Sequence, residues 1–405
     1  MYDFSSIARE DLPAPAARFS GLPQFNFVGG HLAPESIPVE KLIEASKKVL
    51  TEKGSLLATY SVESGPQGYL GLREYLVRKL EKYSSISCHT DDLLLTSGSS
   101  QGMDLINWAL LERGDTVIVE ESNYGGAFSR LVKLGVNRVA IPVDENGMQT
   151  DVLARELELL AARSIKPKYI YTIPTVHNPT GTIMSLQRRE HLLELASKYD
   201  IAVYEDECYA DLVWAGTRPP SLYALDKESR VVHIGTFSKT VAPALRVGYI
   251  LANWSLLSRL LSLKTDAGSG SLEQMMLAEF CEAHFDKHLS DLNKLLQKKL
   301  DTLVAAIDRE FGTAASYEYP PGGIYLWLKL PEVVDTTVLA QVALDSGIAI
   351  NPGSEWSMQS DSLRHLRLCF AKPAHSEIDS GVEALAKVCF EKFGIPEFGS
   401  NKTRT

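Results

Sequence analysis

The sequence predicts an α/β protein with a mostly parallel seven-stranded sheet in a large domain, and a smaller α+β domain after it. Its 405 residues are enough for two domains. Between residues 93 and 251, short apolar runs alternate with amphipathic stretches, as in a parallel sheet covered by helices on both faces. After residue 285 the pattern changes to short strands with two helices, which indicates the second domain.

The first 36 residues are rich in proline and glycine, and they predict an arm or lid with little regular structure. Apolar residues at helical spacing then predict helices at Val39–Leu50 and Tyr69–Tyr83. The predicted strands of the large sheet are Leu93–Thr96, Thr116–Glu120, Asn137–Ile141, Tyr169–Ile173, Ala202–Glu205, Val231–Ile234 and Val247–Leu251. The helices between them are predicted at Gly102–Leu111, Ala127–Leu134, Asp151–Ala162 and Ser185–Tyr199.

Two long helices are expected next, at Gln274–Ala283 and Phe285–Phe311, and the second would connect the domains. The later strands are predicted at Ala315–Tyr319, Gly323–Lys329, Ile348–Asn351 and Arg364–Ala371, with helices at Thr337–Ser346 and Ser376–Phe393. The expected organisation is an N-terminal arm and first part of the small domain (1–50), the large domain (51–284), the rest of the small domain (285–395) and a disordered tail (396–405).

Composition excludes several classes of protein. The net charge of -10 opposes tight binding to nucleic acid or to an anionic membrane. Apolar runs all fall short of the ~20 residues of a membrane helix, and the first residues do not resemble a secretory signal. The five cysteines show no metal-binding spacing, and an odd number of scattered thiols is typical of a reducing compartment. We therefore expect a cytoplasmic protein with no metal site and no nucleic-acid or membrane partner.

The segment GTFSKTVAPALRVGY, residues 235–249, carries the most informative lysine. An apolar strand runs into Gly235, Ser238 and Lys239 follow, and Arg246 comes just before the next apolar run. Burial and nearby cations lower the pKa of a lysine and yield a neutral nucleophilic amine, so Lys239 suits a Schiff base beside a bound phosphate. A solvated loop lysine is the alternative that this segment alone leaves open.

Two further predicted strands are followed by ligand-binding patterns. After Leu93–Thr96 comes SGSSQG, residues 97–102, where the free N–H groups of a helix N-terminus would attract an anion. Capping of the helix by Ser99 or Ser100 is the alternative. After Thr116–Glu120 comes ESNYGG, whose Tyr124 could stack on a planar ligand or simply pack in its loop.

Polar residues also stand where other strands end. The HNPTG turn, residues 177–181, would aim the amide of Asn178, because proline restricts the residue before it, although a plain turn is equally compatible. Asp206 ends a buried strand, where a carboxylate is costly unless it is paired, and it could hold a protonated ring nitrogen with Tyr209 nearby. Arg367 lies inside an apolar strand and needs a carboxylate, either from a ligand or from an internal acidic residue.

Together these segments resemble the fold-type I pyridoxal-phosphate (PLP) enzymes, and the class I/II aminotransferases in particular. The resemblance covers the chain roughly from Phe27 to Phe393. Six motifs occur in the order of the family: SGSSQG, ESNYGG, HNPTG, DECY, SKTVAPALRVGY and LRLCFA. The segments FVGGHLAPESIP, HNPTG and SKTVAPALRVGY look most like the 2-aminoadipate/kynurenine-type branch, which also supplies the enzyme-like domain of MocR-type regulators.

The resemblance implies a role for each residue around the cofactor. Lys239 would form the Schiff base with PLP and move the proton between the substrate Cα and the cofactor. Asp206 would pair with the pyridinium nitrogen, Asn178 and Tyr209 would hydrogen-bond the 3-oxygen, and Tyr124 would stack on the ring. The phosphate would be held by Ser99, Ser100, Gln101, Ser238 and Arg246.

The substrate side of the site is implied in the same way. Arg367 would bind the α-carboxylate, helped by Asn178 and the Gly29–Gly30 backbone. Arg18 is a candidate for contacting the substrate side chain from the N-terminal segment, although a surface arginine is the alternative. No metal is implied.

The resemblance also implies a homodimer with active sites at the interface. In many relatives a tyrosine five residues before the glycine of a G-x-x-x-L-R helix start reaches the phosphate of the neighbouring subunit. Here that start is GYLGLR, residues 68–73, and Tyr60 lies five residues before Gly65 instead, which indicates a three-residue insertion. Tyr60 is still the predicted contact.

The expected activity is transfer of the amino group of an α-amino acid to a 2-oxo acid by a ping-pong cycle, with 2-oxoglutarate/glutamate as one couple by analogy. The same contacts serve elimination or replacement at Cβ or Cγ, or oxidation, so the motifs leave these reactions open. A non-catalytic ligand-sensing protein is disfavoured. MocR-type regulators carry a DNA-binding domain before the enzyme-like part, whereas here the enzyme-like part is expected to begin near residue 25.

Overall fold

The computed structural model describes residues 2–8, 12, 15–16, 18–19 and 21–397. Its largest sheet has seven strands in the order β2-β10-β9-β8-β7-β3-β4. Only β10 runs antiparallel to its two neighbours, so the sheet is mostly parallel, as the sequence predicts. The strands are β2 (Leu93–Ser97), β3 (Thr116–Glu120), β4 (Asn137–Ile141), β7 (Tyr169–Thr172), β8 (Ala202–Asp206), β9 (Val231–Thr236) and β10 (Val247–Leu251).

Both faces of this sheet are buried, because its strands are apolar on both sides. In β3, Val117 and Val119 pack in one cluster and Ile118 packs in another, as expected when successive side chains point to opposite faces. The first face is covered by α3 (Gly98–Leu110), α4 (Gly125–Leu134) and α8 (Trp254–Leu263). The second is covered by α5 (Thr150–Ala162), α6 (Leu186–Lys198) and α7 (Leu222–Leu225).

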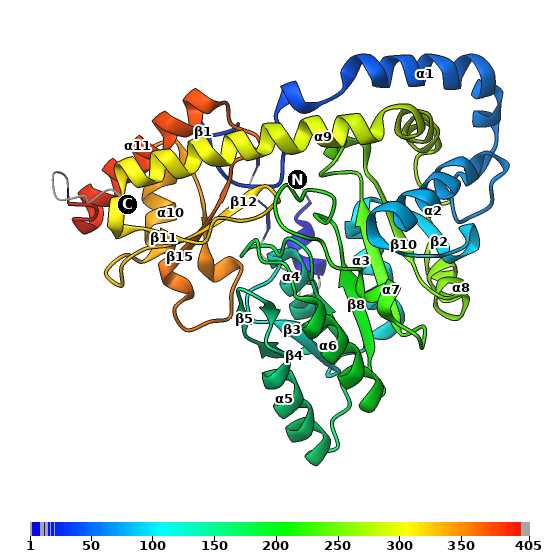
Figure 1. Cartoon of the computed structure of the whole chain (residues 1–405), viewed down its shortest axis with the longest axis horizontal. Helices are drawn as coiled ribbons and strands as arrows, with labels where there is room; N and C mark the ends of the chain where they lie inside the picture. Colours follow the sequence, from blue (N-terminus) through cyan, green and yellow to red (C-terminus); the bar gives the residue numbers. More distant parts are fainter. Residues whose placement is uncertain (1, 9–11, 13–14, 17, 20, 398–405) are drawn as a thin grey trace.

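One long helix joins the two parts of the molecule. Helix α9 (Ser271–Glu310) has 40 residues and runs along the length of the molecule in Figure 1. It packs against α1 (Val39–Lys53), α2 (Leu70–Ser84) and α11 (His375–Phe393). The prediction of two helices that meet at His284 is wrong. This stretch has no glycine or proline to break the helix, and buried apolar side chains continue on both sides of His284.

The second part is built around a four-stranded antiparallel sheet. Its order is β11-β12-β15-β14, formed by β11 (Ser316–Tyr317), β12 (Tyr325–Lys329), β15 (His365–Cys369) and β14 (Asn351–Pro352). Helix α10 (Thr336–Asp345) lies between the strands in sequence. The remaining short strands are β1 (Phe25–Asn26), which pairs with β13 (Ile348–Ala349), and the hairpin of β5 (Val143–Asp144) with β6 (Gly147–Met148).

The β1–β13 pairing joins the N-terminal segment to the second part of the molecule, which suits the expected placement of residues 1–50. The domain boundaries themselves stay a prediction. Most of the predicted disordered tail, residues 398–405, lies outside the described residues. Among the described residues, every helix is too short or too polar to cross a membrane.

We predict that Phe285→Ala lowers the free energy of unfolding by about 3–5 kcal/mol, because it removes a buried ring that packs against other aromatic rings. Phe285 is 1% exposed and lies edge-to-face with Tyr75 and Phe237. Urea denaturation followed by tryptophan fluorescence measures the change. On the same helix, Lys287→Ala truncates a side chain that is 84% exposed, and it should change stability by less than about 0.5 kcal/mol. Equal effects of the two substitutions would contradict the packing described for α9.

Candidate active site

A cavity of about 310 Å³ lies where the carboxyl ends of the central parallel strands face the smaller sheet. Most of the predicted site residues line it, and the exceptions are Gln101, Tyr60 and Arg18. The lining residues are Gly29, Gly30, Ser99, Ser100, Met103, Tyr124, Ile173, Asn178, Asp206, Cys208, Tyr209, Ser238, Lys239, Pro243, Arg246, Tyr325, Asn351, Trp356 and Arg367.

One end of the cavity has the features of an anion site. Ser99 and Ser100 lie in the first turn of α3, whose N–H groups are free of intrahelical partners. Arg246 Nη1 lies 3.4 Å from Ser238 Oγ, and its Nη2 donates to the carbonyl of Ser97. A Cβ on Gly98 would stand 2.1 Å from Arg246 Nη2 and would displace the guanidinium, and the positive φ of Gly98 (72°) also favours glycine. Within the described chain, Arg246 forms no ion pair with an acidic side chain, which leaves its charge available to an anion.

The buried carboxylate of Asp206 ends strand β8. It accepts hydrogen bonds from Tyr171 Oη at 2.8 Å and from the Cys208 N–H at 3.1 Å. Asp206 is only 4% exposed, and burial raises the pKa of its carboxyl above the usual range. None of the described basic side chains forms an ion pair with it. A cationic ring nitrogen in the cavity would supply the missing charge.

Lys239 and Tyr209 lie on the same side of the cavity. Lys239 Nζ donates to the carbonyl of Gly30 at 2.9 Å, and the Tyr209 ring lies below it, 5.8 Å from Nζ to the centroid. A Cβ on Gly30 would stand 2.4 Å from Nζ, so the glycine leaves room for the amine. Burial raises the pKa of Tyr209 well above its usual range, which keeps the phenol protonated and able to donate.

Asn178 is fixed by a buried network under its turn. Glu120, at the end of β3, accepts from Thr172 Oγ1 at 2.5 Å and from the backbone N–H of Ile173 at 3.0 Å. His177 Nε2 lies 3.1 Å from the same carboxylate, while its Nδ1 lies 2.8 Å from Thr180 Oγ1. The turn therefore cannot shift without breaking contacts on both sides, and the Asn178 amide is held toward the cavity.

Arg367 closes the opposite side of the cavity. Its side chain is 1% exposed, and its Nη atoms donate to Asn178 Oδ1 at 3.1 Å, Asn351 Oδ1 at 2.8 Å and the carbonyl of Gly29 at 3.4 Å. The guanidinium lies between two rings, 3.8 Å from the centroid of Tyr325 and 3.4 Å from that of Trp356. No described Asp or Glu pairs with it, which excludes an internal acidic partner within that part of the chain. A ligand carboxylate is the complementary group.

Three predicted residues lie away from the cavity. The Gln101 side chain accepts from the Ser97 N–H at 2.8 Å and donates to Asp266 at 2.6 Å, so its amide is engaged elsewhere and does not support the predicted phosphate contact. Tyr60 is 85% exposed, and Ser61, Val62 and Glu63 after it all have positive φ. Arg18 is exposed, and nothing in the structure supports its predicted contact with the substrate.

Sequence reasoning missed Tyr325, Trp356 and Asn351, which surround Arg367. Tyr325 stands in GGIYLWLK, where an aromatic residue in an apolar strand is typical of the core. No signal in the sequence distinguishes Trp356 from a packed loop residue.

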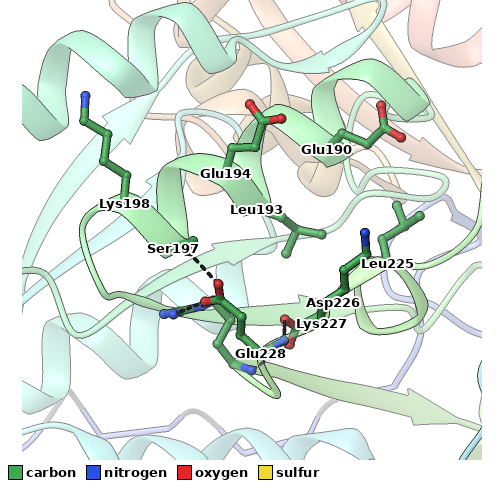
Figure 2. A pocket seen from close by; sticks show the side chains of 10 residues that line it. Glu190, Leu193, Glu194, Ser197, Lys198, Leu225, Asp226, Lys227 and Glu228 are labelled. Atoms are coloured by element: carbon green, nitrogen blue, oxygen red, sulfur yellow. Dashed lines mark hydrogen bonds and ion pairs between the residues drawn. The ribbon is translucent and has the colours of Figure 1, made fainter.

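A larger surface hollow of about 720 Å³ lies elsewhere, between α6 and the segment that follows α7 (Figure 2). It contains none of the predicted residues. Its Glu228 accepts from Ser197 Oγ at 2.8 Å and forms an ion pair with Arg230, so that carboxylate is engaged within the protein. The chemistry therefore belongs to the smaller cavity.

Comparison with known proteins places this site in a family. The family model "Aminotransferase class I and II" matches residues 29–385. The chain belongs to this family. It is accordingly an enzyme that transfers amino groups and uses pyridoxal phosphate as its cofactor, as the sequence predicts. The predicted fold, a fold-type I PLP-dependent transferase, is confirmed as well.

Individual relatives agree with this assignment. The chain is 32% identical to aromatic-amino-acid aminotransferase 1 of Thermococcus litoralis, over 91% of this chain and 88% of the relative. A solved multiple substrate aminotransferase from Thermococcus profundus aligns with a TM-score of 0.87 and 29% identity, covering 97% of this chain and all of the other. The α-aminoadipate aminotransferase of Thermus thermophilus, solved with N-(5'-phosphopyridoxyl)-L-leucine, aligns with a TM-score of 0.82 and 30% identity, covering 90% and 91%.

The residues present fit the cofactor. The cavity offers an unpaired cation and free N–H groups at one end, an unpaired buried carboxylate, and a lysine amine between Gly30 and Tyr209. These are the groups that a phosphate, a protonated pyridine nitrogen and an aldehyde would need.

We predict that Asp206→Asn stabilises the cofactor-free chain at pH 7 by about 1–3 kcal/mol, the usual cost of a poorly satisfied buried polar group, and weakens cofactor binding. Below the usual pKa of aspartate the carboxyl is neutral in both the folded and unfolded chain, so the difference should vanish in acid. The stability difference between the variant and the native chain grows as the pH rises toward the raised pKa of Asp206 in the folded chain. Urea denaturation at a series of pH values from about pH 3, below the usual aspartate pKa, to pH 8 measures this difference in stability.

Asp144→Asn is the matched control, because Arg188 lowers the pKa of that carboxyl. Its stabilisation is present above the unfolded pKa and is lost in acid, so this substitution should destabilise the chain at pH 7. If both substitutions shifted stability in the same direction, the unpaired state of Asp206 would be contradicted.

Proposed function

We propose that Arg367 binds the α-carboxylate of an amino acid and of a 2-oxo acid in turn, so that one site serves both halves of a ping-pong amino transfer. The observation that carries this proposal is the buried guanidinium, which has amide and carbonyl partners but no carboxylate among the described residues. Two substrates that share only the α-carboxylate can both use it.

The proposed roles of the other residues are those that the resemblance implies, and their positions around the cavity support them. When bound, the cofactor supplies an aldehyde that takes up an amino group and a ring that accepts electrons. Asp206 would hold the protonated ring nitrogen, Asn178 and Tyr209 would bind the 3-oxygen, and Tyr124 would cover a ring face. Lys239 holds the cofactor and moves the proton at the substrate Cα. With the carboxylate fixed by Arg367, the Cα–H bond is oriented toward this amine.

The phosphate is assigned to the other end of the cavity. Ser99 and Ser100 offer backbone N–H groups from the first turn of α3, while Ser238 and Arg246 lie 3.4 Å apart across from them. The dipole of α3 and the Arg246 charge both favour a dianion there.

For the amino acceptor we propose 2-oxoglutarate, with glutamate as its product. Support comes from the relative named for α-aminoadipate, a dicarboxylic amino acid one methylene longer than glutamate. The relative named for aromatic amino acids indicates that aromatic donors belong in the same test.

We predict that the purified, cofactor-loaded enzyme converts 2-oxoglutarate to glutamate with at least one amino donor. The test is a panel of amino acids, including aromatic ones and 2-aminoadipate, with products identified by mass spectrometry. Arg367→Lys should raise KM for both substrates by about 10- to 100-fold, because the bidentate contact is lost. Arg364→Lys, at the residue just before the same strand and outside the cavity lining, is the control. Absence of any 2-oxo acid acceptor would overturn the proposal.

We further propose that the enzyme is a homodimer in which Tyr60 contacts the cofactor phosphate of the partner subunit. Tyr60 is 85% exposed in the single chain. The neighbouring helix α1 exposes Val39, Ile43 and Leu50 by 54%, 61% and 50%, which is unusual for a free surface. A second copy of the chain is the proposed cover.

We also propose a cytoplasmic location, supported by five free cysteines.

Mixed dimers test the role of Tyr60. Tyr60→Ala and Lys239→Ala should each reduce activity alone, and mixing the two chains after dissociation should restore it, because one of the two sites then has both native residues. At a fixed amount of the Tyr60→Ala chain, activity of the mixture should be at least about threefold that of Tyr60→Ala alone, since phosphate contacts are worth about 1–3 kcal/mol. No restoration, with mixed dimers confirmed by native mass spectrometry, would show that Tyr60 does not act across subunits.

A further inference from the structure

Tyr325 lies at the junction of two groups that the proposed reaction uses. Its hydroxyl oxygen is 3.2 Å from that of Tyr209, and the two rings meet edge-to-face with centroids 5.7 Å apart. The face of the same ring lies 3.8 Å from the Arg367 guanidinium carbon. One side chain therefore contacts both the phenol assigned to the cofactor and the cation assigned to the substrate.

Strand register fixes this position. Strands β12 and β15 are antiparallel, with Trp327 opposite Arg367 and Tyr325 opposite Cys369. Opposite residues of such a pair share a face, and residues two apart on one strand share it too. Tyr325 is thus the diagonal neighbour of Arg367 on the face that lines the cavity. The backbone register therefore places the Tyr325 side chain beside Arg367.

The hydroxyl of Tyr325 also stands close to the reactive amine. A Cβ on Gly30 would be 2.7 Å from Tyr325 Oη and 2.4 Å from Lys239 Nζ. The two polar atoms therefore border the same small volume. Tyr325 is only 7% exposed, so water competes little for its hydroxyl.

We propose that Tyr325 is a positioning residue that donates its hydroxyl hydrogen to Tyr209 and thereby directs the hydrogen of Tyr209 to the 3-oxygen of the cofactor. This inference rests on the proposed role of Tyr209. Each phenol has one hydrogen, and a hydroxyl that accepts a hydrogen bond becomes a stronger donor. The Tyr325 ring is stacked on Arg367, so it also fixes the position of that guanidinium relative to the phenol of Tyr209.

Tyr325→Phe removes the hydroxyl and keeps the stacked ring. Without the hydroxyl of Tyr325, the hydrogen bond from Tyr209 to the 3-oxygen is weaker and stabilises the ionised oxygen less. The proton on the Lys239 nitrogen beside that oxygen is then held more tightly. The midpoint of the pH titration of the bound cofactor's visible absorption should rise by about 0.5 pH unit, a modest change for one indirect hydrogen bond. KM for the amino donor should stay within about twofold, because the contact with Arg367 remains.

A double-substitution cycle separates this inference from the role of Tyr209. Tyr209→Phe should raise the midpoint further, and Tyr325→Phe should add nothing in that background, because its effect passes through Tyr209. If Tyr209→Phe left the midpoint unchanged, the role of Tyr209 would be wrong. If Tyr325→Phe shifted the midpoint equally in both backgrounds, Tyr325 would act on its own, and the inference would be overturned.

Two further variants complete the experiment. Tyr325→Leu also removes the ring, and it should raise KM for the amino donor by about tenfold, the scale of a desolvated cation–π contact. No rise in KM would contradict the role of the ring. Tyr319→Phe is the control, because that hydroxyl donates to Asp301 outside the cavity. It should change neither the absorption midpoint nor KM.

Discussion

The site depends on burying charges that the protein leaves without a partner. Three consecutive acidic residues, 205–207, differ in whether they have a basic partner. Glu205 lies 2.8 Å from His233 Nδ1, and Glu207 lies 3.4 Å from Arg218 and 3.7 Å from Arg189. Asp206, between them, points to the opposite face, where its partners are the phenol of Tyr171 and a backbone N–H. Of these three acidic residues, the one that faces the cavity is the one without a basic partner among the described residues.

Arg367 is the matching case on the other side of the cavity. Breaking a buried ion pair usually costs several kcal/mol, so an unpaired guanidinium inside a sheet would not persist without other support. The support comes from two amide oxygens, one carbonyl and two aromatic faces. These partners hold the planar group in one orientation while leaving its charge for a substrate. The cavity is therefore complementary to a ligand with one cationic ring and one free carboxylate.

Much of this could be predicted from the sequence, and for a physical reason. All seven strands of the large sheet were expected within two residues at each end, because they are short apolar runs bounded by polar turns. Lys239, Asp206 and Asn178 were found because polar residues at the ends of buried strands are costly and therefore informative. The sheet brings these strand ends to one edge, so residues far apart in sequence meet in one cavity.

Other features depend on contacts that the sequence does not display. Tyr325 and Trp356 have the composition of core residues, and only the pairing of β12 with β15 shows that they enclose a cation. Gln101 has the place in the SGSSQG motif that predicts a phosphate contact, but Asp266 engages its side chain from a distant loop. The continuity of α9 past His284 depends on tertiary packing, because its buried side chains continue on both sides of that residue.

The central claim is that the unpaired charges of the cavity are paired by the cofactor and the substrate. A crystal structure of the cofactor-loaded enzyme with an unreactive dicarboxylate tests it most directly. We predict the cofactor on Lys239, its ring nitrogen within hydrogen-bond distance of Asp206, and one carboxylate in bidentate contact with Arg367. A cofactor attached to another lysine, or a carboxylate bound away from Arg367, would contradict the account.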